Sequence, residues 1–341
     1  IIAGSPSGGI WKTIDGGNTW YPCYDHTMDI DIWSLEISHA DRDLYFAGTN
    51  SEIVYSTDGG LSWDRVNGGP LGNQVNTIIM DPGNSNVLLA TDRWGEGIWR
   101  SSDGGINWTK VYSAPNDSYD IEFKPGNSNI VYASGLGFIA KSTDNGQSWT
   151  EITTGPWLSG GVIMLAVTAD ASSRLYALQE TGGGYHATFL SLNEGANWTT
   201  QSDNSSGTNN ILTYNQNNGG GQAPRDMDIV VSPTDKNEVY VAGVELWRST
   251  DQGVNFIKIA DWLVNSALPF IHADVDLLYY NDNALYAATD GGLFVSTDNA
   301  VSWTDWTSGT GVRQFYRIGV SATELDRVSG GSQDNGTGTL V

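Results

Sequence analysis

The stretch Ser101–Trp108, SSDGGINW, has the pattern Ser/Thr-x-Asp-x-Gly-x-x-Trp, and this pattern recurs along the chain with small variations. Each copy lies between two short apolar segments. Repetition at a fixed interval is typical of proteins built from similar units that pack side by side. The seven copies are centred on Asp15, Asp58, Asp103, Asp144, Asn193, Asp251 and Asp298.

The residues of this pattern are those of a tight turn that caps itself. An Asp side chain accepts hydrogen bonds from backbone amides two residues on, and Gly adopts the positive φ that other residues avoid. The Trp is large enough to cover the turn from the following strand. We therefore expect each copy to form the turn of a β-hairpin.

The spacing of the copies predicts the fold. They lie about 41 to 58 residues apart, an interval that suits a four-stranded blade. Between copies, an apolar strand, a Pro/Asn/Asp turn and another strand follow one another, as in Ile78–Ala90. The chain is therefore predicted to be all-β, a β-propeller of four-stranded antiparallel blades with at least seven blades, in one region spanning 1–341. The blades are expected at about 1–25, 29–67, 74–113, 118–154, 161–200, 226–260, 273–307 and 314–341.

The two ends of the chain are predicted to be incomplete blades. Ile1–Gly4 has the pattern of a second strand without a first strand before it, whereas residues 315–341 supply two strands and the start of a third. In a seven-bladed ring, Val328–Gly331 would duplicate Ile1–Gly4. We therefore expect a fragment of a larger protein that has more blades or a second propeller.

The composition argues against several classes of function. A net charge of −23 with only 16 Lys and Arg disfavours binding to nucleic acid or anionic membranes, because both need clustered basic residues. The sequence contains no run of about 18 apolar residues, so no membrane-spanning segment is predicted. Cys23 is the only cysteine, so no disulfide forms within the chain. No cofactor or metal site is predicted, and a bound Ca²⁺ is compatible with the acidity without being indicated by it.

The repeated turns and the functional residues are expected on opposite faces. In a meandering blade, the turn between the third and fourth strands lies on one face, and the second-to-third and fourth-to-first connections lie on the other. We expect the repeated turns to be structural and adjacent blades to bring polar residues of the other face together near the axis. A hydrogen-bonded plug filling the channel mouth would have the same composition, and this alternative stays open. The candidates for ligand binding are Arg93, Trp94, Arg225, His272, Asp276, Gln333, Asp334 and Asn335, and the further carboxylates are Asp92, Asp274 and Asp290.

The repeated turns resemble the Asp-box, or BNR, repeat of sialidases, sortilin-type receptors and two-propeller xyloglucanases. The stretch from His272 to Gly336, together with Gly8–Thr13, resembles the sortilin-like Asp-box propellers of large secreted Bacteroidetes proteins. This resemblance implies an extracellular or cell-surface location and further domains in the parent chain. The arginine triad and Tyr/Glu nucleophile pair of sialidases have no matching motif here.

Three functions are compatible with the sequence: a binding module, a glycoside hydrolase and a purely architectural spacer. The main hypothesis is a secreted or cell-surface module, not an enzyme, that binds a protein or glycan partner on its loop-rich face. The alternative is a glycoside hydrolase acting on β-glucan or xyloglucan, because xyloglucanases carry a catalytic Asp in an Asp-x-Gly-Gly motif that Asp290-Gly291-Gly292 matches. Asp290 and Asp274 are then the catalytic candidates, and Asp92 occupies the equivalent position of another blade. Such chemistry needs two carboxyl groups flanking the sugar bond, about 5–5.5 Å apart for retention or 6.5–9.5 Å for inversion.

Overall fold

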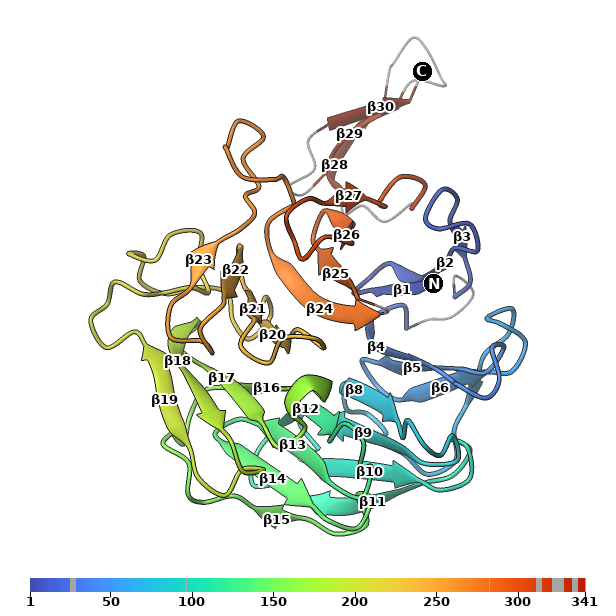
Figure 1. Ribbon diagram of the computed structural model, residues 1–341. Coiled ribbons are helices and arrows are strands. Elements are labelled where there is room, and N and C mark those ends of the chain that lie inside the picture. Colours follow the sequence, from blue (N-terminus) through green and yellow to red (C-terminus); the bar gives the residue numbers. More distant parts are fainter. Residues whose placement is uncertain are drawn as a thin grey trace.

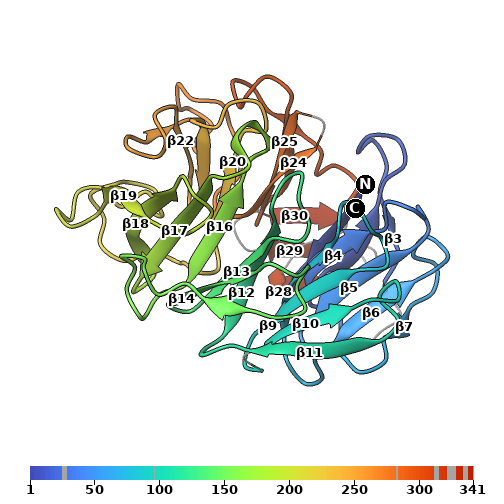
Figure 2. The ribbon, with the colours of Figure 1, turned by 60° about the horizontal axis from the view of Figure 1, so that its bottom comes forward.

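The computed structural model describes residues 1–24, 29–95, 97–281, 283–310, 315–320, 328–332 and 337–340. Its sheets are arranged around a central axis, as Figures 1 and 2 show. The short 3₁₀ helix η1 (Ala169–Ala171) is the one helix in this part of the chain, so the predicted all-β class is confirmed. Among the described residues, no helix is long and apolar enough to span a membrane.

The strands form eight antiparallel sheets in which neighbouring strands follow one another along the chain. Six sheets have four strands, and the first and last have three. Blade one contains β1 (Ile2–Ser5), β2 (Gly9–Lys12) and β3 (Tyr21–Pro22); blade two contains β4 (Ile32–Ile37), β5 (Tyr45–Thr49), β6 (Ile53–Ser56) and β7 (Asp64–Arg65); blade three contains β8 (Val75–Met80), β9 (Leu88–Asp92), β10 (Gly97–Ser101) and β11 (Trp108–Ser113); blade four contains β12 (Ser118–Phe123), β13 (Val131–Gly135), β14 (Phe138–Ser142) and β15 (Thr150–Glu151). Blade five contains β16 (Ile163–Val167), β17 (Leu175–Thr181), β18 (Gly184–Ser191) and β19 (Thr199–Asp203); blade six contains β20 (Asp228–Val231), β21 (Val239–Ala242), β22 (Leu246–Ser249) and β23 (Ile257–Lys258); blade seven contains β24 (Val275–Asn281), β25 (Ala284–Thr289), β26 (Gly292–Ser296) and β27 (Thr304–Asp305); the last sheet contains β28 (Phe315–Val320), β29 (Val328–Ser332) and β30 (Thr337–Leu340).

The ring closes with seven blades. The first strands of successive blades contact one another around the axis from β4 to β24, and β1 contacts β4. Between blade one and blade seven, the indole Nε1 of Trp20 donates a hydrogen bond to the carbonyl of Trp306 at 2.9 Å. Figure 1 shows the sheet β28–β30 extending away from this ring. The predicted propeller with at least seven blades is therefore confirmed, and the eighth sheet is surplus to the ring.

The seven repeated turns share one hydrogen-bond pattern. The Ser or Thr hydroxyl donates to the Asp or Asn Oδ1 at 2.7–3.1 Å, and accepts from the amide four residues on at 2.8–3.0 Å. The Asp or Asn Oδ1 also accepts from the amide four residues beyond it at 2.8–2.9 Å. The prediction that the Asp side chain accepts from the amide two residues on is wrong. The Ser or Thr hydroxyl is the group that accepts from the amide two residues beyond it. Side-chain and backbone hydrogen bonds from Ser62 hold the pKa of Asp58 down to about 2. The Asp58 carboxylate is therefore ionised at neutral pH, and its hydrogen bonds serve the structure of the turn.

The turn glycines also set the distance between blades. A Cβ built on Gly105 of blade three would lie 2.2 Å from Phe46 Cε1 of blade two. A Cβ on Gly146 of blade four would lie 2.7 Å from a methyl carbon of Leu89 in blade three. Because these two turns rest on the preceding sheet, Gly105 and Gly146 are needed for close approach as well as for positive φ. The copy in blade seven has Ala300 at this position, with φ +61°.

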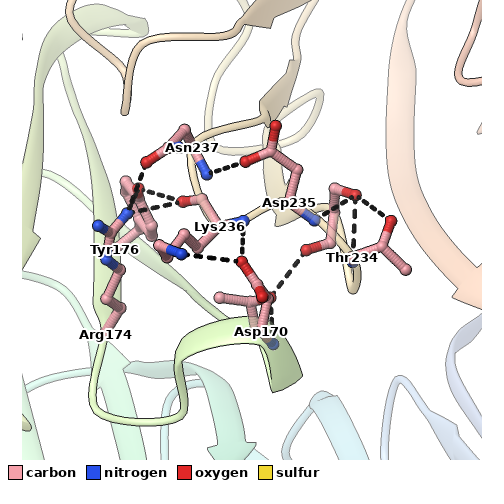
Figure 3. A network of polar contacts seen from close by, with 9 residues as sticks. Asp170, Arg174, Tyr176, Thr234, Asp235, Lys236 and Asn237 are labelled. Carbon is pink, nitrogen blue, oxygen red and sulfur yellow. Dashed lines mark hydrogen bonds and ion pairs between the residues drawn. The ribbon is translucent and has the colours of Figure 1, made fainter.

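The face that carries the repeated turns is reinforced by polar contacts between blades. Figure 3 shows one network, in which the Lys236 amide of blade six donates to Asp170 Oδ2 at 3.0 Å. Arg174 Nη1 donates to the Lys236 carbonyl and to Asn237 Oδ1, both at 3.0 Å. The Tyr176 hydroxyl donates to the same Lys236 carbonyl at 2.7 Å. These contacts connect blades five and six on the face opposite the predicted functional residues.

Candidate functional site

Acidic residues stand at the ends of the second strands of several blades, and most of them close their own turns. Asp92 ends β9 and is fully buried, and its Oδ1 accepts from the Gly97 amide at 2.6 Å. The indole of Trp99 also donates to Asp92 Oδ2 at 3.1 Å. Glu180 in blade five accepts from the amide of Gly183 at 3.0 Å. These two carboxylates are used by the fold.

Asp290 follows β25 in blade seven and is placed differently. Its turn is closed by Thr289, whose hydroxyl accepts from the Gly291 amide at 3.1 Å and donates to the Gly292 carbonyl at 3.0 Å. The Asp290 carboxylate instead accepts from Arg225 Nη2 at 2.7 Å. The side chains of Arg225 and Asp290 are 52% and 18% exposed, so this ion pair is open to solvent.

The two glycines after Asp290 are required by their surroundings. A Cβ on Gly291 would lie 2.1 Å from the imidazole of His272, which packs directly on the turn. Gly292 has φ +132°, and a Cβ there would lie 2.0 Å from Thr307 Oγ1. The Asp-Gly-Gly motif therefore fits beneath His272, which positions the turn that carries Asp290.

Asp274 connects blade six to the same turn. It has φ +59°, and its amide donates to the Val244 carbonyl at 3.1 Å. Its own carbonyl accepts from the Asp290 amide at 3.1 Å, which holds the two predicted catalytic residues side by side along the backbone. Its Oδ1 accepts from Gln222 Nε2 at 2.9 Å.

Asp226 and Asp276 form an acidic pair next to Arg225. Asp276 lies on β24, and Asp226 precedes β20 in the neighbouring blade and has a side chain only 1% exposed. Burial and then the negative charges of Asp226 and Asp290 raise the pKa of Asp276 to about 8, although the charge of Arg225 opposes this rise. Burial and the charge of Asp274 raise the pKa of Asp226 to about 6, while a hydrogen bond with Asp276 and the charge of Arg225 oppose this rise. One carboxyl group of the pair is therefore protonated at neutral pH.

The structure brings together five of the residues predicted from sequence: Arg225, His272, Asp274, Asp276 and Asp290. Sequence analysis missed Asp226, although its place one residue after Arg225 and just before a first strand was a usable signal. Gln333, Asp334 and Asn335 lie outside the described residues. Within the described part of the chain, no group of three or more His, Cys, Asp or Glu side chains is arranged to hold a metal ion.

Arg93 and Trp94 form a second cluster on the same type of connection in blade three. The Arg93 guanidinium lies 5.4 Å from the ring centroid of Trp94 and 5.5 Å from that of Tyr119. Arg93 Nε lies 3.7 Å from Asp117 Oδ2, and the Trp94 amide donates to Asp117 Oδ1 at 3.0 Å. The Trp94 ring is 57% exposed, so it presents an aromatic surface supported by a cation.

No family model matches the chain. The chain is 26% identical over 322 residues to a xyloglucanase of Paenibacillus sp., a match covering 76% of this chain and 30% of the relative. It is 28% identical over 204 residues to xyloglucanase Xgh74A of Acetivibrio thermocellus, covering 46% of this chain and 24% of the relative. The crystal structure of an ancestral GH74 enzyme superimposes with a TM-score of 0.74 at 18% identity, covering 99% of this chain and 51% of that one.

The chain thus spans less than a third of the length of these curated relatives and about half of the solved structure. The similarities confirm a seven-bladed, xyloglucanase-like propeller, and the Asp-box and sortilin-like assignment stays a prediction. They favour the hydrolase alternative over the binding module that was the main hypothesis from sequence.

Proposed function

We propose that this chain contributes catalytic residues to a glycoside hydrolase acting on β-glucan or xyloglucan. The observation that carries this proposal is the difference between Asp290 and Asp92. Asp92 ends its second strand at the position that Thr289 occupies in blade seven. Thr289 closes that turn, and the Asp290 carboxylate one residue on pairs with Arg225 in an open position. The xyloglucanase relatives support the same reaction class.

The site has the two protonation states that the reaction needs. Hydrolysis of a glycosidic bond requires one carboxyl group that donates a proton to the leaving oxygen and one carboxylate that activates water or attacks the sugar. Asp290 supplies the second carboxyl group, which Arg225 Nη2 contacts at 2.7 Å. Asp276 supplies the proton, since its pKa of about 8 keeps it protonated at neutral pH.

Asp274 is the other carboxyl group of the predicted pair. Its hydrogen bond from Gln222 and its backbone contact with Asp290 place it at the edge of the same cluster. We assign Asp274 either to contact with the substrate or to the role of proton donor. Asp276 is the other candidate for that second role. Variants of each residue separate these roles.

Trp94 and Arg93 extend the proposed site to blade three. An exposed indole stacks well on a sugar ring, and the guanidinium beneath it limits its movement. This cluster and the acidic cluster both belong to the loop-rich side predicted to bind a ligand. We propose that a polysaccharide contacts both.

The remaining assignments rest on the resemblance of the sequence. We propose that the repeated turns are Asp-boxes, that the protein acts outside the cytoplasm or at the cell surface, and that further domains accompany this propeller. The greater length of the curated relatives supports the last point.

Release of reducing ends from xyloglucan and mixed-linkage β-glucan tests the proposed function in the full chain. We expect wild type to release sugar, and we expect Asp290→Asn and Asp276→Asn to lose about 100-fold or more of kcat. Asp274→Asn is expected to lose activity to the same extent only if Asp274, and not Asp276, is the acid.

Asp64→Asn is the matched control, because it makes the same chemical change at an exposed position of β7 in blade two. Urea unfolding of each variant checks that the fold is retained. Binding of the polysaccharide without release of reducing ends would instead support a binding module.

A further inference from the structure

Asp226 is a buried carboxyl group that the proposed reaction does not use directly. Neither of its carboxyl oxygens has a hydrogen-bond donor from the described residues, apart from the pairing with Asp276. Asp276 Oδ1 is likewise buried without a donor. The nearest cation is Arg225, whose Nε lies 3.6 Å from Asp226 Oδ1.

Two ionised carboxylates are not stable in this arrangement. Removing one carboxylate from water without hydrogen bonds costs several kcal/mol, and a second one beside it adds repulsion. A single proton between the two groups removes one charge and supplies the missing hydrogen bond. This is the same solution that other proteins use when two carboxyl groups share a site.

We propose that Asp226 is a positioning residue that keeps a proton on Asp276 and holds this carboxyl group towards the substrate. This inference rests on the proposed function for its catalytic consequence, but not for the sharing of the proton. Asp226 is the partner whose Oδ1 lies 3.6 Å from Arg225 Nε, and this cation stabilises its negative charge, so Asp226 carries the charge and Asp276 the proton.

The charged groups around the pair agree with this assignment. Asp274 directly precedes β24, the strand that contains Asp276, and Asp290 lies on the turn between β25 and β26. Both increase the cost of a further negative charge, whereas Arg225 offsets one charge. His272 packs on Gly291 of that turn.

The proton balance of the reaction is closed with water as the co-reactant. Asp276 gives its proton to the glycosidic oxygen as the carbon–oxygen bond breaks, and Asp290 takes a proton from the water that attacks the sugar. Solvent then returns a proton to Asp276 and removes one from Asp290. Two ionised carboxylates exist only transiently, and their repulsion favours rapid reprotonation.

Carboxyl titration by NMR tests the shared proton without any substrate. The full chain is labelled with ¹³C at the Asp carboxyl carbon, and the signal that disappears in Asp276→Asn identifies Asp276. We expect this signal in wild type to titrate above pH 7, and to move down by about 1 pH unit or more in Asp226→Asn. Asp274→Asn is the matched control and should move it less, because the charges that raise the pKa of Asp276 are those of Asp226 and Asp290, whereas the charge of Asp274 acts on Asp226.

Two results would overturn the inference. One is an Asp276 signal that titrates near pH 4 in wild type, a measurement that needs no variant to fold. The other is an Asp276 titration that Asp226→Asn leaves in place, with an unchanged urea midpoint showing that the variant is folded.

The activity of the same variants gives the catalytic consequence. In Asp226→Asn, the alkaline limb of the kcat profile should move to lower pH in step with the NMR titration, with little change in KM. If wild type hydrolyses none of the polysaccharides, the proposed function fails while the NMR result still decides whether the proton is shared.

Discussion

The contact between each repeated turn and the preceding blade predicts different effects for two adjacent glycines. Gly104 and Gly105 have nearly the same backbone conformation, with φ of +77° and +85°. A Cβ on Gly104 would lie no closer than 3.9 Å to any other group, whereas a Cβ on Gly105 would lie 2.2–2.4 Å from the Phe46 ring. Changing each glycine to Ala therefore separates backbone strain from overlap between blades.

The size of each effect follows from these two terms. Ala at positive φ costs about 1–2 kcal/mol, and the reduced entropy of the unfolded chain offsets about 0.4–1 kcal/mol of it. We expect Gly104→Ala to lower the free energy of unfolding by about 1 kcal/mol. Gly105→Ala should lower the free energy of unfolding by the same amount and by about 1–3 kcal/mol more, because the added methyl group overpacks the contact with Phe46.

Urea unfolding followed by tryptophan fluorescence measures the difference. With a slope of about 3 kcal/mol/M or more for a chain of this length, 2 kcal/mol moves the urea midpoint by about 0.7 M or less. Adding Phe46→Leu should restore part of the loss in Gly105→Ala and should be additive with Gly104→Ala. Equal midpoints for the two glycine variants would refute the idea that the turn glycine sets the distance between blades.

Three further measurements test the ring and its electrostatics. Arg174→Met keeps the apolar stem but removes the hydrogen bonds to the Lys236 carbonyl and its neighbour, and should lower the free energy of unfolding by about 1–3 kcal/mol, measured by urea unfolding. Trp20→Phe removes the hydrogen bond to Trp306 that closes the ring and should cost at least about 1 kcal/mol; an unchanged urea midpoint would argue against this closure. Burial raises the pKa of Asp228 to about 8, so the folded state holds a proton that the unfolded state loses near pH 4, and stability should fall as pH rises from about 4 to 8. Asp228→Asn should make the urea midpoint less dependent on pH in that window.

The separation of the two faces has a direct physical cause. On one face, short turns are completed by their own side chains and rest on the neighbouring blade, as Ser101 and Asp103 show. On the other face, longer connections leave side chains such as Arg225 and Asp290 to pair across blades.

Local chemistry made the blades readable from the sequence. The hydrogen bonds of a repeated turn all join residues close together in the sequence, so the residue pattern around Asp103 is enough to predict the structure of that turn. The spacing of seven such turns then predicted four-stranded blades. The placement of Arg225, His272, Asp274 and Asp290 on one face followed from the alternation of connections in a blade.

Long-range packing accounts for what the sequence could not predict. The ring closes through Trp20 and Trp306, which are 286 residues apart, and no local pattern encodes that contact. The sequence placed Asp92 and Asp290 at equivalent positions, but the strand register is different, because Asp92 pairs with Val75 as Thr289 pairs with Val275. Asp92 is buried in its turn, whereas Asp290, one residue beyond the matching position, faces Arg225. The protonation of Asp276 depends on burial and on Asp226 from the next blade, because a pKa reflects the surroundings of a carboxyl group in space and not its neighbours along the chain.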